Sequence, residues 1–168
     1  MRVAGNVAGV SELGSMEYAV EHLRTPLLVI MGHTGCGAVT AAVAAAESSP
    51  QTNGQTNGQT NGHAHGGGAE DHIGALLAHI EPAVERARRQ YPGATGAEFV
   101  ELAVRENVWQ TIFEIVRSSP GCRDAIRAGD LQVVGAVDDL STGAVAWLGE
   151  HPWRAEIVAA FPDRIEEP

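Results

Sequence analysis

The chain has 168 residues, of which 44% are hydrophobic, so it is long enough to form one domain with a buried core. Its formal net charge of −10 argues against a protein that binds nucleic acid, because contact with the phosphate backbone needs clustered cations. All 11 basic residues are arginines, which excludes a Schiff-base lysine and a lysine-dependent phosphate loop.

The first fifty residues predict a helix followed by a strand, a loop and a second helix. Apolar residues recur at helical spacing over residues 13–23, and Pro26 ends this segment. Residues 27–31 form a continuous apolar run, which is typical of a strand covered on both faces in a parallel sheet. A glycine-rich loop at 32–37 and an alanine-rich helix at 38–47 complete the βα unit of an open α/β fold.

Residues 48–68 interrupt this pattern with a low-complexity segment. Gln-Thr-Asn-Gly occurs three times in a row and is followed by His63, His65 and a run of glycines. The segment is too polar to pack, so we interpret it as a flexible surface insertion within a single domain of residues 1–168. The two histidines could contact a metal ion, but an unstructured pair seldom makes a specific site.

Helices dominate the next sixty residues. The helical pattern resumes at Glu70, and Pro82 is expected to end or kink that helix. Thr95, with a glutamate three residues later, fits a capping box that opens a long helix. Pro120 starts a short helix, which Gly129 ends.

The last forty residues predict two strands and a final helix. Residues 131–137 form a second apolar strand, and residues 138–143 form a turn. Residues 144–148 are expected to be an edge strand, and a short amphipathic helix follows within the last twenty residues. Strands alternating with helices indicate an α/β fold.

Cysteine usage and the apolar runs indicate the compartment. Cys36 and Cys122 are too few for a disulfide framework in a chain of this size. No apolar run approaches the roughly 20 residues that span a bilayer, and residues 1–10 have too short an apolar stretch for a signal peptide. We therefore expect a cytoplasmic protein without a membrane partner, in which both thiols stay free or bind metal.

One glycine-rich loop carries the residues with the clearest chemistry. His33 and Cys36 lie three positions apart after a buried strand, at the sheet edge where sites form in open α/β folds. Imidazole and thiolate are both zinc ligands, and the N-terminus of the next helix favours the thiolate. Gly32, Gly35 and Gly37 allow a sharp turn, so both side chains can converge on one ion.

Three other interpretations of this loop stay open at this point. Gly32 and Gly37 have the spacing of a phosphate-binding loop, but Ala38 and Val39 stand where Lys and Ser or Thr should follow. The order of the glycines is wrong for the dinucleotide motif G-x-G-x-x-G. A tight turn around a buried cysteine would need no ligand, and a single H-x-x-C pair is a weak signal.

Several segments, in the same order, resemble the β-class carbonic anhydrases. Residues 26–42, PLLVIMGHTGCGAVTAA, resemble the second zinc motif of that family. Residues 2–6 resemble its Arg-Asn-Ala-Gly-Asn segment with one substitution, and residues 15–20 resemble the helix that follows. Residues 106–108 resemble part of its long helix, and residues 135–143 resemble its Gly-x-x-Tyr-Asp-Leu-x-Thr-Gly segment with aspartate in place of tyrosine. The resemblance covers most of the chain outside the insertion.

The resemblance implies a zinc site and a reaction. By this resemblance, His33 and Cys36 would be two of the three protein ligands to one zinc ion. Asn6 would line the site together with Gly32, Gly35 and Gly37. The family reaction is the reversible hydration of CO2 to bicarbonate, which makes these proteins zinc lyases.

The third ligand of the family is a cysteine in a Cys-x-Asp-x-Arg motif, which precedes the segment that residues 2–6 resemble. The 168 residues contain no such motif. With two ligands, we expect weak zinc binding and little or no activity from this chain alone. Cys122 is an alternative third ligand. Four further histidines are expected on the surface or on helix faces: His22, His72, His79 and His151.

The resemblance also implies a three-layer α/β fold, with a mostly parallel central sheet flanked by helices, here without its first central strand. A missing central strand leaves unpaired backbone groups on its neighbours. We therefore expect a homodimer or higher oligomer, or a separate chain that supplies the missing half and the third ligand. The alternatives are a non-catalytic family member that binds zinc weakly, one half of a split enzyme, and an unrelated nucleotide-binding α/β domain.

Overall fold

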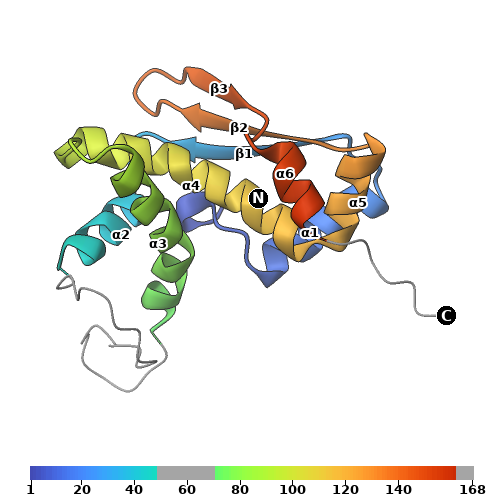
Figure 1. The fold of residues 1–168 in the computed structure, drawn as a ribbon, viewed down its shortest axis with the longest axis horizontal. Helices are drawn as coiled ribbons and strands as arrows, with labels where there is room; N and C mark the ends of the chain where they lie inside the picture. The colour runs from blue at the N-terminus through green and yellow to red at the C-terminus, as the bar shows by residue number, and fades with distance from the viewer. Residues whose placement is uncertain (49–70, 162–168) are drawn as a thin grey trace.

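A computed structural model describes residues 1–48 and 71–161 of the protein (Figure 1). Beyond Ser48, the predicted insertion lies outside the described residues. None of the helices within these two ranges is long and apolar enough to cross a membrane. In chain order the elements are the 3-10 turn η1 (Ala4–Asn6), α1 (Val10–Glu21), β1 (Leu27–His33), α2 (Gly37–Ser48), α3 (His72–Gln90), α4 (Gly96–Ser118), α5 (Pro120–Ala128), β2 (Gln132–Asp138), β3 (Val145–Gly149) and α6 (Arg154–Ala160).

The described residues form one mixed sheet in the order β1-β2-β3. β1 pairs with β2 in parallel, from Leu27 opposite Gln132 to His33 opposite Asp138. β2 pairs with β3 in antiparallel fashion. The three predicted strands and the α/β class are confirmed, and both parallel strands end at the loop that carries His33.

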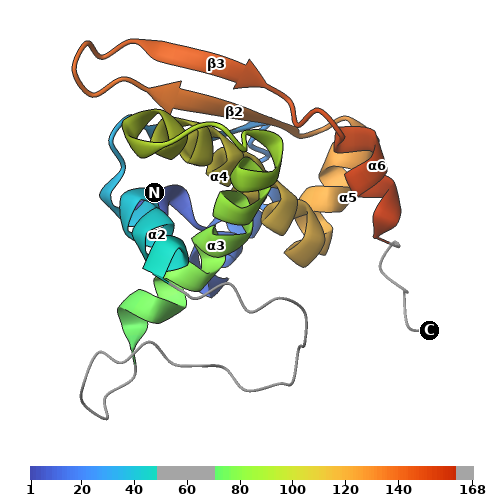
Figure 2. The ribbon, with the colours of Figure 1, turned by 60° about the vertical axis from the view of Figure 1, so that its left-hand side comes forward.

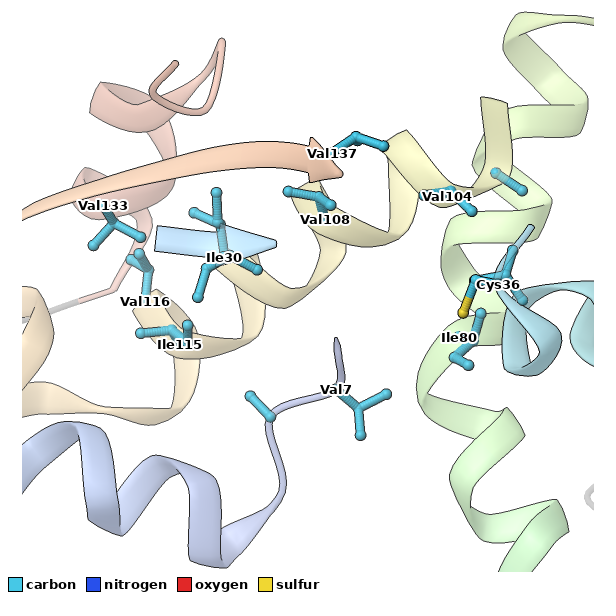
Figure 3. Packing of buried hydrophobic residues seen from close by; sticks show 14 of the residues in the cluster. Val7, Ile30, Cys36, Ile80, Val104, Val108, Ile115, Val116, Val133 and Val137 are labelled. Carbon is cyan, nitrogen blue, oxygen red and sulfur yellow. The ribbon is translucent and has the colours of Figure 1, made fainter. Parts of the chain in front are cut away.

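Helix α4 packs against one face of the sheet (Figures 1 and 2). A Cβ atom at Gly32 would lie 3.0 Å from Val104 and from Val108, so β1 approaches the helix closely only because this position has no side chain. Val108 and Ile115 are fully buried. Figure 3 shows Ile30 of β1 among these α4 side chains. The core is therefore mostly aliphatic, in keeping with an aromatic content of 5% in the sequence.

Helix α3 continues through Pro82, so the alternative that the helix ends at this residue is wrong. Pro82 itself is exposed, whereas Ile80, Ala83 and Val84 beside it are fully buried. The packing of these side chains, in a helix that lies against α4, offsets the hydrogen bond that proline cannot donate.

Among the described residues, both outer strands have an unpaired backbone edge, and one face of the sheet lacks a covering element. β1 has β2 as its one neighbour in the sheet, so its other backbone edge is unpaired there. Met31, Ala136 and Trp147 share a row across the face opposite to α4. Met31 is 42% exposed and Trp147 is 64% exposed. This row gives the outer face an apolar surface.

Candidate metal centre

The loop between β1 and α2 holds the His-Cys pair at the carboxyl end of the parallel strands. His33 is the last residue of β1, and Cys36 directly precedes α2. The Cys36 carbonyl accepts the N–H of Thr40 at 2.9 Å, so Cys36 caps the helix. Its side chain is only 4% exposed and belongs to the aliphatic core, where Figure 3 shows it near Ile80.

The imidazole of His33 is oriented by the backbone of the next residue. Its Nδ1 lies 3.0 Å from the carbonyl oxygen of Thr34. Because a carbonyl oxygen can only accept, Nδ1 must carry the hydrogen, and Nε2 of the neutral ring keeps its lone pair. Metal-bound histidines have this arrangement, with the outer nitrogen bonded to a carbonyl or carboxylate. An imidazole nitrogen and a cysteine sulfur are both donors that zinc accepts.

Two separate parts of the fold hold the middle of the loop. The N–H of Thr34 donates to the Asp138 carbonyl at 2.9 Å, and its hydroxyl accepts the N–H of Leu140 at 3.1 Å. From the other side, a carboxylate oxygen of Glu101 in α4 accepts the N–H of Gly35 at 2.9 Å. Sequence reasoning missed both roles, because Glu101 is far from the loop along the chain.

The turn after β2 is held by Asp139. Its carboxylate accepts the N–H of Ser141 at 2.9 Å, the hydroxyl of Ser141 at 2.7 Å and the hydroxyl of Thr142 at 2.9 Å. These hydrogen bonds, chiefly those from Ser141, lower the pKa of Asp139 below its ordinary value. The predicted turn is confirmed. Its Leu140 N–H donates to Thr34 in the loop of residues 32–37, which we call the metal loop.

A polar network lies behind Gly32. Asn107 of α4 donates from Nδ2 to the carbonyl of Gly5 at 2.6 Å and to Oδ1 of Asn6 at 3.2 Å. The amide of Asn6 donates to the hydroxyl of Thr111 at 3.2 Å. Asn107 Oδ1 is buried without a partner among the described residues. Gly5 has a φ of +66°, and a Cβ there would lie 2.5 Å from Ile80, so this turn requires glycine.

A groove of about 580 Å³ runs along the unpaired edge of β1. One wall is the strand itself, from Leu28 to His33, and the other is the N-terminal segment, including Arg2, Asn6 and Met16. The groove ends at His33 and Asp138, which pair across the sheet. An extended segment placed there would therefore lie beside β1 and reach the metal loop.

The structure brings together the sequence-predicted residues of the loop but separates them from the alternative ligand. Cys122 is buried near the start of α5, at the end of the sheet where β1 and β2 begin (Figure 1). A seven-residue strand is roughly 20 Å long, so Cys122 is not placed to share an ion with Cys36. Burial raises the pKa of the Cys122 thiol, as expected for a structural cysteine.

Of the four histidines expected on the surface or on helix faces, three are exposed: His22, His72 and His79. His151 differs, because it lies between β3 and α6 and contacts the ring of Trp109 edge-on. The described residues contain no group of three or more histidine, cysteine, aspartate or glutamate side chains arranged to hold a metal ion. The loop therefore provides two candidate ligands.

Comparisons with known proteins point to one family. Residues 1–145 match the sequence profile of the carbonic anhydrase family. The chain is 32% identical over 151 residues to carbonic anhydrase 2 of Mycobacterium tuberculosis, a match that covers 90% of this chain and 62% of the relative. The chain thus spans about three fifths of the length of that curated relative.

Solved structures of β-carbonic anhydrases have a similar fold. The enzyme CafA of Aspergillus fumigatus superposes with a TM-score of 0.67 at 24% identity, covering 95% of this chain and 67% of the other. A structure described as one of two tetrameric β-carbonic anhydrases of Sordaria macrospora gives a TM-score of 0.63 at 22% identity, covering 89% and 66%. At these identities the likeness concerns the fold.

Proposed function

Because the chain belongs to the β-class carbonic anhydrase family, we propose that it contributes to the reversible hydration of CO2 to bicarbonate, with His33 and Cys36 as zinc ligands. Zinc, when bound, supplies a Lewis acid that lowers the pKa of water from 15.7 towards about 7. The residues of this chain would hold the ion and close one side of the site.

The orientation of His33 is the observation that carries this proposal. Its Nδ1 is engaged by the Thr34 carbonyl at 3.0 Å, which directs the free lone pair of Nε2 away from the backbone. Cys36 follows in the same loop, at the position directly before helix α2. The polar atoms of Asn6 and Thr111 line the groove beside β1, which ends at His33.

We further propose that the remaining zinc ligand reaches the loop along the groove beside β1. The groove has an unpaired strand edge as one wall and ends at His33. An extended segment there would satisfy backbone groups of β1 and bring a side chain next to the loop. The segment could precede this sequence in the same polypeptide or belong to another chain, and the proposal holds in either case.

Two further features of the protein belong to the proposal. We expect it to self-associate, since the outer face of the sheet exposes Met31 and Trp147. We also expect a cytoplasmic protein, because the two cysteines, Cys36 and Cys122, are both free.

The zinc site is tested by comparing two cysteine variants. Cys36→Ala removes a proposed ligand, whereas Cys122→Ala removes an equally buried thiol at the other end of the sheet. Competition with a chromophoric chelator should give measurable zinc binding for the wild type and Cys122→Ala, and at least about tenfold weaker binding for Cys36→Ala. Equal zinc affinity in all three proteins would contradict the assignment.

The reaction is tested by stopped-flow CO2 hydration with added zinc. The 168-residue chain should show little activity above background, because it supplies two ligands where catalytic zinc normally has three. A polypeptide that also contains a Cys-x-Asp-x-Arg segment should gain activity, and Cys36→Ala should abolish it. If the completed polypeptide binds zinc but stays inactive, the proposed reaction is wrong. The chain would then be a non-catalytic family member that binds zinc.

A further inference from the structure

The two side chains that hold the middle of the metal loop suggest a role in setting its geometry. We propose that Thr34 and Glu101 are positioning residues, which fix the orientation of the His33 imidazole and the course of the chain into Cys36. This inference rests on the proposed zinc site and extends it to residues that touch neither the ion nor a substrate.

Thr34 connects the ligand histidine to the turn after β2. Its carbonyl accepts from His33 Nδ1, its N–H donates to Asp138, and its hydroxyl accepts from the Leu140 N–H. All three hydrogen-bonding groups of this residue are therefore engaged. The Thr34 carbonyl shares its peptide plane with the Gly35 N–H, which donates to Glu101. Loss of the hydroxyl would remove the contact of Thr34 with the Leu140 N–H and so loosen the plane whose carbonyl contacts His33.

Glu101 holds the opposite side of the same loop. Its carboxylate accepts the Gly35 N–H at 2.9 Å, a bond strengthened by the negative charge. Gly35 has a φ of +62°, and no atom lies within 4 Å of the place a Cβ would occupy. Glycine is therefore required there by the backbone conformation rather than by lack of space, and an external acceptor can hold that conformation.

Helix α4 gives Glu101 a rigid base. One turn along the same helix, Val104 is 1% exposed and packs directly under Gly32. The helix thus contacts the loop at two places, by packing below Gly32 and by a hydrogen bond at Gly35. A buried helix cannot shift without disturbing the core. The two contacts therefore fix the positions of His33 and Thr34, which lie between Gly32 and Gly35.

The test uses paired variants at both positions. Glu101→Ala and Thr34→Val remove the acceptors, whereas Glu101→Gln and Thr34→Ser keep an acceptor oxygen. Glu98→Ala is the control, because Glu98 is an exposed carboxylate in the first turn of the same helix. Nitrogen-15 NMR of the metal-free protein reports the tautomer of the neutral His33 ring, and chelator competition reports zinc affinity.

We expect the wild type, Glu98→Ala, Glu101→Gln and Thr34→Ser to keep the Nδ1–H tautomer of His33. Glu101→Ala and Thr34→Val should give a mixture of tautomers and a zinc affinity lower by about tenfold. An unchanged tautomer in both of these variants would overturn the proposal. So would an equal loss of zinc affinity in Glu101→Ala and Glu101→Gln, since charge alone would then account for the effect.

The two readouts separate this inference from the proposed function. If the wild type binds no zinc, the zinc site fails, while the tautomer measurement still decides whether Thr34 and Glu101 orient His33. If the wild type binds zinc and the variants keep both the tautomer and the affinity, the positioning role fails and the zinc site stands.

Discussion

The imidazole of His151 is partly buried between β3 and α6. Its ring lies edge-on to Trp109 with centroids 5.4 Å apart, and its Nδ1 accepts the N–H of Trp153 at 3.0 Å. Burial, together with the positive charge of Arg86, lowers the pKa of His151 from 6.5 to about 4. Both the acceptor role and the burial require the neutral ring.

This single residue predicts a dependence of stability on pH. Because the unfolded chain binds the proton more tightly, the contribution of His151 is complete above about pH 6.5 and is lost as the pH falls towards 4. Between pH 6.5 and 4, the free energy of unfolding of His151→Gln should fall less than that of the wild type, by about 1–2 kcal/mol once solvent screening of this partly exposed ring is allowed for. Urea denaturation at several pH values measures this, with the exposed His79→Gln as control; parallel curves would contradict it.

At the scale of elements, α3 carries a proline in its interior without being interrupted. Pro82 cannot donate a backbone hydrogen bond, and its ring crowds the preceding turn. Since Pro82 is exposed, Pro82→Ala should remove this cost without losing core contacts. We expect the free energy of unfolding to rise by about 1–3 kcal/mol. The control is Pro92→Ala, in the turn after α3, which should leave the free energy of unfolding unchanged or lower it slightly. Equal effects of the two substitutions would refute the argument.

At the scale of the whole molecule, the sheet is covered by α4 on one face and is open on the other among the described residues. Trp147 is 64% exposed on that open face, in a row with Met31. If this face is an interface between copies of the chain, Trp147→Arg should raise the dimer dissociation constant at least about tenfold in sedimentation experiments. Trp153→Arg, at a tryptophan that is 66% exposed before α6, should not. A monomeric wild type would contradict this prediction.

The sequence by itself determined the parts of this protein that depend on neighbouring residues. The apolar runs placed β1, β2 and β3, and Pro120 with Gly129 placed the ends of α5. The three-residue spacing of His33 and Cys36 identified the candidate ligand pair, and the ordered segments identified the family, which the match over residues 1–145 bears out. These signals are local, so one segment at a time was enough to interpret them.

Only the tertiary structure decided which distant residues meet the loop. Glu101 reaches Gly35 across 66 positions, and Asn107 reaches Gly5 across 102, because α4 passes under both segments. Packing also kept α3 helical at Pro82 and partly buried His151, against what local patterns predicted. Such contacts depend on which elements lie side by side, and in one sequence no local period or spacing records that arrangement.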